Sequence, residues 1–336
     1  MIKYNKIYLW HVLFIIFIGL WIACQKQYQD DGRIVYRLKW LLNSGAAGSL
    51  YANANGFFHA QGLDVSIRAG GVERNAITEI EMGRAQFGVA TGDQIIRALE
   101  KGSPICVLAQ LFQKSPLCWM YYKNRKDIKS LQDLKGKTIG ITFGNEDETI
   151  MRALLKKADI HTDEVKFYSV RYDYTPFYTG KVDLWPVYLN SNGIVIQEKL
   201  QSANEQISFF SPHDNGVQFV GNTIICSQKL ATQKKELICK FKHAIIKGWT
   251  HALDKKNISQ TVDIIKSFDE TTDRKLIEKQ LISSRLLMTP SDNRPLGTVT
   301  LTDWKQTEQF LIDQQIITSP VLLTDKNIFF KGNCYE

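Results

Sequence analysis

Carboxylate, amide and aromatic side chains recur where an apolar, strand-like stretch of the sequence gives way to a loop. Asp93 follows QFGVATG, and Glu146 and Asp147 lie just beyond GKTIGITF. Carboxylates at such points can accept hydrogen bonds from an amino-pyrimidine or an ammonium group. Trp40 can stack on a flat heterocycle while the amide of Asn43 bonds its edge. These residue types suit a small, polar, nitrogen-containing molecule.

The other candidate ligand contacts also lie near the ends of expected strands. They are Thr91, Gln113, Gly144, Asn145, Asp173, Trp185, Tyr188 and Asn190. Structural roles remain alternatives, because Asp93 can cap a helix and Trp40 can pack in the core. The consecutive acids 146–148 can stabilise the start of a helix. Because they crowd this turn with negative charge, a neutral or cationic ligand fits it better than a phosphate.

Alternating strand and helix patterns predict an α/β fold that positions these residues. Strands are expected at 35–42, 63–70 and 86–92, with helices at 76–85 and 93–102. A second strand and helix series starts near Asp127, so the chain should form two lobes, each a mostly parallel sheet flanked by helices, with a ligand cleft between them. Lobe 1 is expected to comprise 35–122 and about 225–336, and lobe 2 to comprise 123–224. Ligands of parallel sheets bind beyond the carboxyl ends of the strands, which selects the loops 42–45, 91–94, 112–115, 143–148 and 186–190.

Residues 1–24 have the layout of an export signal, with lysines before an apolar run that ends in Ala23-Cys24. Cys24 after a small residue resembles a bacterial lipoprotein processing site, where the cysteine becomes the lipidated N-terminus. Trp21 departs from that pattern, since an aliphatic residue is usual there. An uncleaved membrane anchor and a plain secretory signal are the alternatives. All three place the domain outside the cytoplasm, with 25–34 as a linker, and we expect a membrane tether.

Composition excludes several other classes. The net charge of +8 comes from 42 basic and 34 acidic residues that are interleaved, without a zinc or helix-turn-helix motif, so no nucleic-acid partner is expected. Five cysteines remain beyond Cys24, none with metal-ligand spacing, and one disulfide is compatible with export. No G-x-S-x-G, H-E-x-x-H or P-loop motif occurs. We therefore expect no catalytic residue, no metal and no cofactor.

Two motifs carry a family resemblance: GFFHAQGLDV at 56–65 and DLKGKTIG at 133–140. With EMGRAQFGVATGDQIIRALEKGSPICVLAQ between them, they resemble periplasmic substrate-binding proteins of ABC importers in the thiamine-pyrimidine-precursor, sulfonate and nitrate group. The resemblance runs from about Tyr36 to Leu253. It implies a type II periplasmic-binding-protein fold and a monomer that delivers its ligand to an inner-membrane ABC permease and ATPase. A pyrimidine-precursor-like ligand is favoured, and a ligand-sensing domain is an alternative.

One branch of this family is a thiamine pyrimidine synthase, which consumes lysine-bound pyridoxal phosphate and its own histidine in a single turnover, with iron at a CCCFC stretch. The resemblance places Ala90 at the lysine position and Gln94 at the histidine position. The stretch GVQFV at 216–220 stands near the expected cysteines. Since all three elements are absent, the resemblance implies a binding protein that is not this enzyme.

Overall fold

The computed structural model describes residues 32–71, 73–125, 128–171, 173–289, 294–321, 328–332 and 334. The residues from Ile34 onward form one compact unit. Cys24, Trp21 and the rest of the predicted export signal lie outside the described residues. Among the residues that are described, none of the helices combines the length and the apolar character needed to cross a membrane.

Lobe 1, as we name the part built on the first sheet, has five strands in the order β2–β1–β3–β10–β4. β1 pairs in parallel with β2 and β3, whereas β10 runs antiparallel between β3 and β4. The strands are β1 (Ile34–Arg37), β2 (Val65–Arg68), β3 (Phe87–Ala90), β4 (Ile105–Gln110) and β10 (Thr223–Ser227). The helices of this lobe are α2 (Ala47–Ala54), α3 (Ala76–Glu81), α4 (Gly92–Glu100), α8 (Gln228–Gln233), α9 (Lys235–Ala252), α10 (Ile258–Lys266), α11 (Arg274–Met288) and α12 (Leu301–Asp313).

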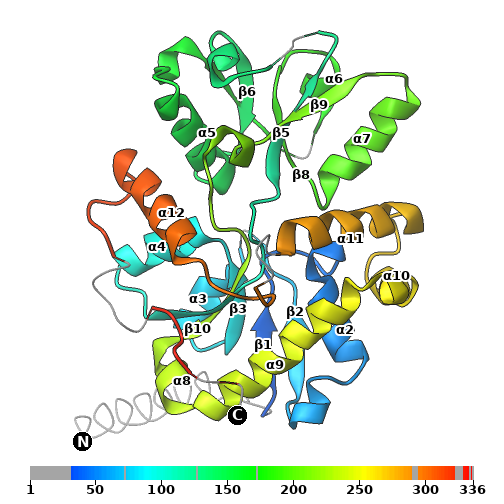
Figure 1. Cartoon of the computed structure of the whole chain (residues 1–336), viewed down its shortest axis with the longest axis vertical. Coiled ribbons are helices and arrows are strands. Elements are labelled where there is room, and N and C mark those ends of the chain that lie inside the picture. The colour runs from blue at the N-terminus through cyan, green and yellow to red at the C-terminus, as the bar shows by residue number, and fades with distance from the viewer. Residues whose placement is uncertain are drawn as a thin grey trace, which may run out of the picture. The chain divides into compact units, whose positions relative to one another are not determined.

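Lobe 2, the part built on the remaining strands, repeats this arrangement (Figure 1). β5 runs antiparallel between β8 and β9, and β6 pairs in parallel with β7. A parallel bridge from Ile139 to Leu184 joins β6 to the start of β8, so the order β7–β6–β8–β5–β9 matches that of lobe 1. The elements are β5 (Leu117–Tyr122), β6 (Thr138–Ile141), β7 (Lys166–Ser169), β8 (Trp185–Tyr188), β9 (Ile207–Phe210), α5 (Glu146–Lys157), α6 (Thr175–Tyr178) and α7 (Asn192–Ser202).

The predicted α/β organisation is present, with one antiparallel strand in the interior of each sheet, β10 in lobe 1 and β5 in lobe 2. The strand Leu117–Tyr122 was expected in lobe 1, but it is hydrogen-bonded to the strands of lobe 2. Its hydrogen bonds to β8 and β9 assign it to lobe 2, although it follows β4 of lobe 1 closely in sequence. The chain therefore crosses between lobes before Leu117, one strand earlier than predicted.

The first strand is shorter than the predicted range 35–42, which matters for the site. β1 ends at Arg37, and the chain then bends into a loop that is held by a bond from the Gly70 backbone N–H to the Trp40 carbonyl, 2.9 Å. A Cβ atom at Gly70 would lie 1.9 Å from the Leu38 oxygen, so only glycine fits beside this loop. The close approach places Lys39 and Trp40 in a loop and not in a strand.

A disulfide joins Cys239 of α9 to Cys334, with the two Cα atoms 5.0 Å apart. The sequence allowed one such bond. Cys106, Cys118 and Cys226 are buried free thiols, as expected for the first and last from their apolar surroundings. The bond fixes the segment around Cys334 to a helix that covers lobe 1.

Helices α2 and α9 pack against each other through glycine. A Cβ atom at Gly48 would lie 2.1 Å from the Trp249 side chain, and one at Gly248 would lie 2.4 Å from the Gly48 carbonyl oxygen. Trp249 is itself fully buried. The two helix backbones can approach this closely only while both positions lack a side chain.

We expect Gly48→Ala to lower the free energy of unfolding by about 1–3 kcal/mol, the usual cost of overpacking. An alanine in a helix normally stabilises it by up to about 1 kcal/mol relative to glycine, so the sign is diagnostic. Urea unfolding of this variant measures the effect, with Thr250→Ala on the exposed face of α9 as the control. A Gly48→Ala protein as stable as the original would show that the helices are not held at this separation.

Candidate functional site

Side chains from both lobes converge on Glu146, which opens α5 of lobe 2 and is 5% exposed. Its Oε2 lies 3.1 Å from Lys39 Nζ and 3.2 Å from the Tyr188 hydroxyl, and its Oε1 lies 3.3 Å from Ser115 Oγ. Lys39 follows β1 of lobe 1, Ser115 belongs to the crossing segment, and Tyr188 ends β8 of lobe 2. One carboxylate therefore ties together both lobes and the connection between them.

Asp93 is a second buried carboxylate near this cluster, and it is 1% exposed. Neither of its oxygens has a hydrogen-bond partner among the described residues. Burial raises its pKa and the charge of Glu146 raises it further, while weak interactions with the Thr91 side chain, Lys39 and the Gln94 backbone oppose this rise. A buried carboxylate without partners is costly, because nothing replaces the water that it has lost.

The alternative role of Asp93 as a helix cap is wrong. α4 begins at Gly92 with Thr91 as its N-cap, and the Thr91 N–H donates to Gln94 Oε1 at 3.2 Å. The pair Thr91 and Gln94 provides the cap, so Asp93 lies inside the first turn. Its carboxylate is thus available for something other than holding the helix.

Asp147 is the third carboxylate of the site. Its Oδ2 accepts a 2.7 Å hydrogen bond from the Thr142 N–H, at the end of β6. Burial raises its pKa to about 6, with a smaller contribution from Glu146. The pKa of the Tyr188 hydroxyl is likewise raised well above its ordinary value, by burial first and then by Glu146 and Asp147. The region favours protons and positive charge.

Local sequence explains how α5 delivers its acids to the junction. Gly144 has a φ of +80°, and its N–H donates to Glu148 Oε2 at 2.7 Å. Asn145 then takes the N-cap position in extended conformation, so Glu146 and Asp147 fall in the first turn. Carboxylates there benefit from the positive end of the helix dipole.

The structure brings four predicted site residues together: Asp93, Glu146, Asp147 and Tyr188. Thr91 lies two residues before Asp93, at the end of β3. Gly144 and Asn145 form the adjoining turn and are exposed. Asn190 is buried two residues beyond Tyr188.

Other predicted residues have structural roles. Trp185 is buried in lobe 2 against Tyr174 and Phe177, with ring centroids 5.6 and 6.2 Å away. Asp173 is exposed and accepts a 2.9 Å bond from the Thr175 N–H, and the Thr175 hydroxyl together with this N–H lowers its pKa. The side chains of Trp185 and Asp173 are thus both engaged by other residues of lobe 2.

Gln113 and Asn43 also bond within the chain. The Gln113 amide donates to the carbonyls of Gln110 and Thr298 at 3.1 and 3.2 Å, and its oxygen accepts from Thr300. Asn43 accepts a 3.0 Å bond from the Gly45 N–H and so caps a 3-10 helix at 44–46.

Trp40 remains 42% exposed, beside the lysine that reaches Glu146. Its side chain is therefore not used in core packing.

Two residues of the cluster were missed from the sequence. Lys39 was treated as part of a strand, although it lies at the carboxyl end of β1, where ligands of such folds bind. Ser115 lies within a loop that the strand-end rule selected, but its hydroxyl was not singled out. Both donate to Glu146.

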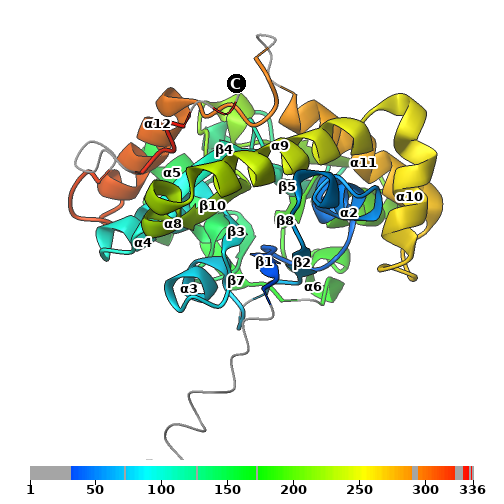
Figure 2. The same cartoon turned by 90° about the horizontal axis from the view of Figure 1, so that it is seen from below.

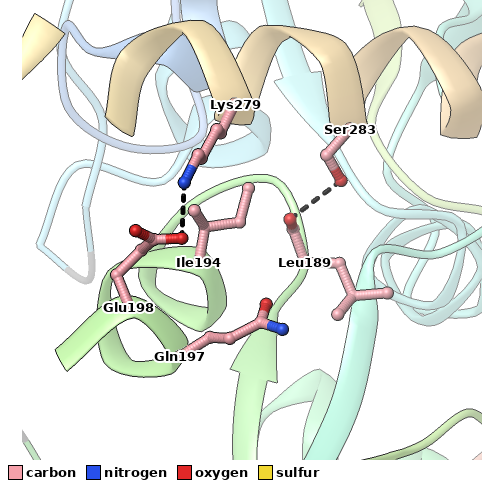
Figure 3. Close-up of a pocket in the computed structure, with 6 residues that line it drawn as sticks. All are labelled: Leu189, Ile194, Gln197, Glu198, Lys279 and Ser283. Carbon is pink, nitrogen blue, oxygen red and sulfur yellow. Dashed lines mark hydrogen bonds and ion pairs between the residues drawn. The ribbon is translucent and has the colours of Figure 1, made fainter. Parts of the chain in front are cut away.

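The lobes also touch beside this cluster, where α11 of lobe 1 meets α7 and the end of β8 (Figure 3). Ser283 Oγ donates to the Leu189 carbonyl at 2.8 Å, and Lys279 Nζ lies 2.6 Å from Glu198 Oε1. Gln280 donates to the Ser191 carbonyl at 3.2 Å. A cavity of about 310 Å³ opens here, lined by Leu189, Ile194, Gln197, Glu198, Lys279 and Ser283.

Comparison with known proteins places this geometry in a family. Residues 43–257 match the family model described as NMT1/THI5 like. The chain belongs to the NMT1/THI5-like family. The riboflavin-binding protein RibY of Chloroflexus aurantiacus is 24% identical over 322 residues, which cover 90% of this chain and 87% of RibY. A putative thiamine biosynthesis protein of Haemophilus influenzae is 23% identical over 61% of this chain and 64% of that protein.

Among solved structures, the periplasmic aliphatic sulphonate binding protein SsuA from Escherichia coli superposes with a TM-score of 0.65. It is 14% identical, and the alignment covers 85% of this chain and 88% of SsuA. At this identity the similarity establishes the fold. The predicted two-lobed periplasmic-binding-protein fold of the NMT1/THI5-like chain is thereby confirmed.

The raised pKa of Asp147 sets a pH dependence of stability. The pKa rises from 3.8 to about 6 on folding, so the folded chain binds this proton more tightly than the unfolded chain. The contribution of Asp147 to stability is therefore most favourable below about pH 4 and is lost as pH rises to about 6, by roughly 3 kcal/mol. Asp147→Asn should match the original protein at pH 4 and exceed it at pH 7.

Urea unfolding at pH 4, 5, 6 and 7 measures this difference, because effects of other groups cancel between the two proteins. Asp173→Asn is the control, since its lowered pKa gives the opposite sign. A constant stability difference across the four pH values would contradict the assignment.

Proposed function

We propose that this protein is the extracytoplasmic solute-binding component of an ABC importer. It takes up a small ligand with N–H donors, of the nitrogen-heterocyclic kind, in the cleft between its lobes and closes on it by hinge motion. The protein acts as a monomer and hands the ligand to a membrane permease and its ATPase. Lobe 1 then comprises the chain up to the crossing before Leu117 together with the part from β10 onward.

The observation that carries this proposal is the buried carboxylate of Asp93, neither oxygen of which has a close hydrogen-bond partner among the described residues. It is placed near Glu146 and Asp147, where parallel strands of both lobes end, and this is where ligands of such folds bind. An N–H donor on a ligand would replace the missing hydrogen bonds. A bond to a charged acceptor contributes about 1.5–3 kcal/mol, enough to decide specificity.

Charge separates this ligand class from an oxyanion. The site combines three carboxylates with one lysine, and Lys39 is already engaged by Glu146. A sulfonate or nitrate placed here would meet like charge. The exposed ring of Trp40 adds a surface on which a flat heterocycle can stack.

Export fits the rest of the chain. A disulfide such as Cys239–Cys334 forms and persists in oxidising compartments outside the cytoplasm. Such bonds are rare in the reducing cytoplasm. Together with the lysine-led apolar segment and Cys24, this disulfide supports a tethered extracytoplasmic protein whose cysteine carries the lipid.

Titration calorimetry of the purified protein against an aminopyrimidine, thiamine, riboflavin, a polyamine, nitrate and an alkanesulfonate tests the proposed ligand class. We expect binding of a nitrogen-rich ligand and a loss of about 10- to 100-fold for Asp93→Asn, which removes the charged acceptor. Asp173→Asn, with an exposed carboxylate that bonds to the Thr175 N–H and not to the cluster, should leave the affinity unchanged.

The same variant reports on the opposite class of ligand. If the ligand is an anion, Asp93→Asn removes a repulsion and should tighten its binding. Tighter binding, or a well-folded protein that binds nothing on the panel, would overturn the proposal.

The synthase reaction of the family is not expected here. β3 carries Ala90 where the lysine for pyridoxal phosphate would stand, and the side chain of Gln94, at the histidine position, is used in the cap of α4. Incubation with pyridoxal phosphate and iron should yield no pyrimidine product. Borohydride reduction should leave no stoichiometric lysine adduct by mass spectrometry, and formation of product in one turnover would refute this reading of the site.

A further inference from the structure

Helix α9 lies on the side of lobe 1 that is remote from lobe 2 (Figures 1 and 2). A second cavity opens on this helix. It has a volume of about 430 Å³ and is lined by Lys242, His243, Ile246, Lys247, Thr250, His251 and Cys334. The α9 residues recur at the spacing of one helix face. Its lining contains two lysines and two histidines and no acidic residue. We call this cavity the α9 groove.

The lysines of the α9 groove have no ion-pair partner within the described part of the chain. Among the described residues, neither Lys242 nor Lys247 forms an ion pair, whereas Lys240 on the same helix is paired with Glu236 at 2.6 Å. Lys247 lies over the Phe57 ring at 4.7 Å, which positions it. Lys242 is half-buried, and burial lowers its pKa. An anion in the groove would neutralise an ammonium that none of the described carboxylates pairs with.

The chain enters lobe 1 at the end of the sheet that is remote from the junction of the lobes, a position that suits attachment to a membrane. Ile34 starts β1, whose carboxyl end faces the junction of the lobes, so the entry point lies at the opposite end of the sheet. A linker of ten residues, 25–34, spans at most about 35 Å. A tether of this length holds the end of lobe 1 that is remote from the cleft near the lipid surface.

We propose that the α9 groove binds the phosphate headgroups of anionic phospholipids. This contact holds the tethered protein at the lipid surface between deliveries to the permease. The proposal rests on the export and tethering proposed above. It adds a second, anion-selective site to a protein whose cleft is built for N–H donors, and it uses residues that take no part in the cleft.

Vesicle co-sedimentation tests the proposal with the fragment 32–336, which lacks the tether and retains all the buried clusters of the described chain. We expect it to bind vesicles of phosphatidylcholine with 30% phosphatidylglycerol and not vesicles of phosphatidylcholine alone. Each lysine near an anionic surface contributes about fivefold in affinity, so Lys242→Ala/Lys247→Ala should weaken binding by about 25-fold.

The matched control is Lys135→Ala/Lys240→Ala, which removes the same net charge from lysines that are paired with Glu164 and Glu236. It should weaken binding only slightly. An equal loss in both double variants would show a diffuse charge effect and overturn the proposed site, as would absent or headgroup-independent binding. Full competition by inorganic phosphate at constant ionic strength would assign the groove to a free anion instead.

The test of lipid binding at the α9 groove can be separated from the test of ligand binding in the cleft. Ligand affinity of Lys242→Ala/Lys247→Ala, measured by calorimetry, should equal that of the original protein. Loss of vesicle binding with intact ligand binding supports the α9 groove. Vesicle binding by a protein that takes up no ligand would reject the proposed transport role and leave the groove standing.

Discussion

The arrangement where the two lobes meet follows from one constraint. Three carboxylates, those of Asp93, Glu146 and Asp147, are buried, and the described residues pair only one ammonium, that of Lys39, with them. Glu146 and Asp147 are compensated by Lys39, by hydroxyl groups and by a backbone N–H. Asp93 receives no such bond among the described residues. Uncompensated buried charge opposes folding, so the chain retains at this point an instability that an added hydrogen-bond donor would relieve.

The repeated sheet topology makes this concentration of charge feasible. In each lobe, β1 or β6 is flanked by parallel neighbours, and a strand that belongs to the return path runs antiparallel, β10 in lobe 1 and β5 in lobe 2. Residues at the carboxyl ends of the parallel strands then face each other across the junction. Lys39 from lobe 1 can reach Glu146 of lobe 2 for that reason. The contacts of α11 with lobe 2 hold the lobes together beside the cluster, through bonds that each contribute little on their own.

Much of this could be predicted from residue patterns, and the failures have physical causes. The rule that ligands bind beyond strand ends located Asp93, Glu146 and Tyr188 without knowledge of the lobes' arrangement. Lys39 was missed because LKWLL alternates like a strand, while the close approach of Gly70 to Leu38 that bends the chain is a long-range contact. Trp185 was grouped with Tyr188 from the sequence, but side chains three residues apart on a strand point to opposite faces, and that of Trp185 is buried in lobe 2.

The remaining differences between expectation and structure arise because side chains bond to groups within the chain. Asp93 was offered as a cap because its residue type favours that position, but Thr91 and Gln94 cap α4 together and leave the carboxylate unused. Gln113 and Asp173 have the polarity of ligand contacts, yet their bonding capacity is met by nearby backbone groups. A sequence shows which groups can bond, and the fold decides which of them are left over.

Those unsatisfied groups, and not the fold, carry the proposal for the charge of the ligand. SsuA and this protein share a fold at 14% identity, and a fold of this kind fixes where a ligand sits without fixing its charge. Here the strand ends present carboxylates, and the unpaired lysines lie on α9 at the far side of lobe 1. The carboxylate of Asp93 and the lysines of the α9 groove thus lie at different places on lobe 1. A ligand that bonds to Asp93 and a lipid headgroup that pairs with Lys242 and Lys247 would therefore not compete, and the protein could hold both at once.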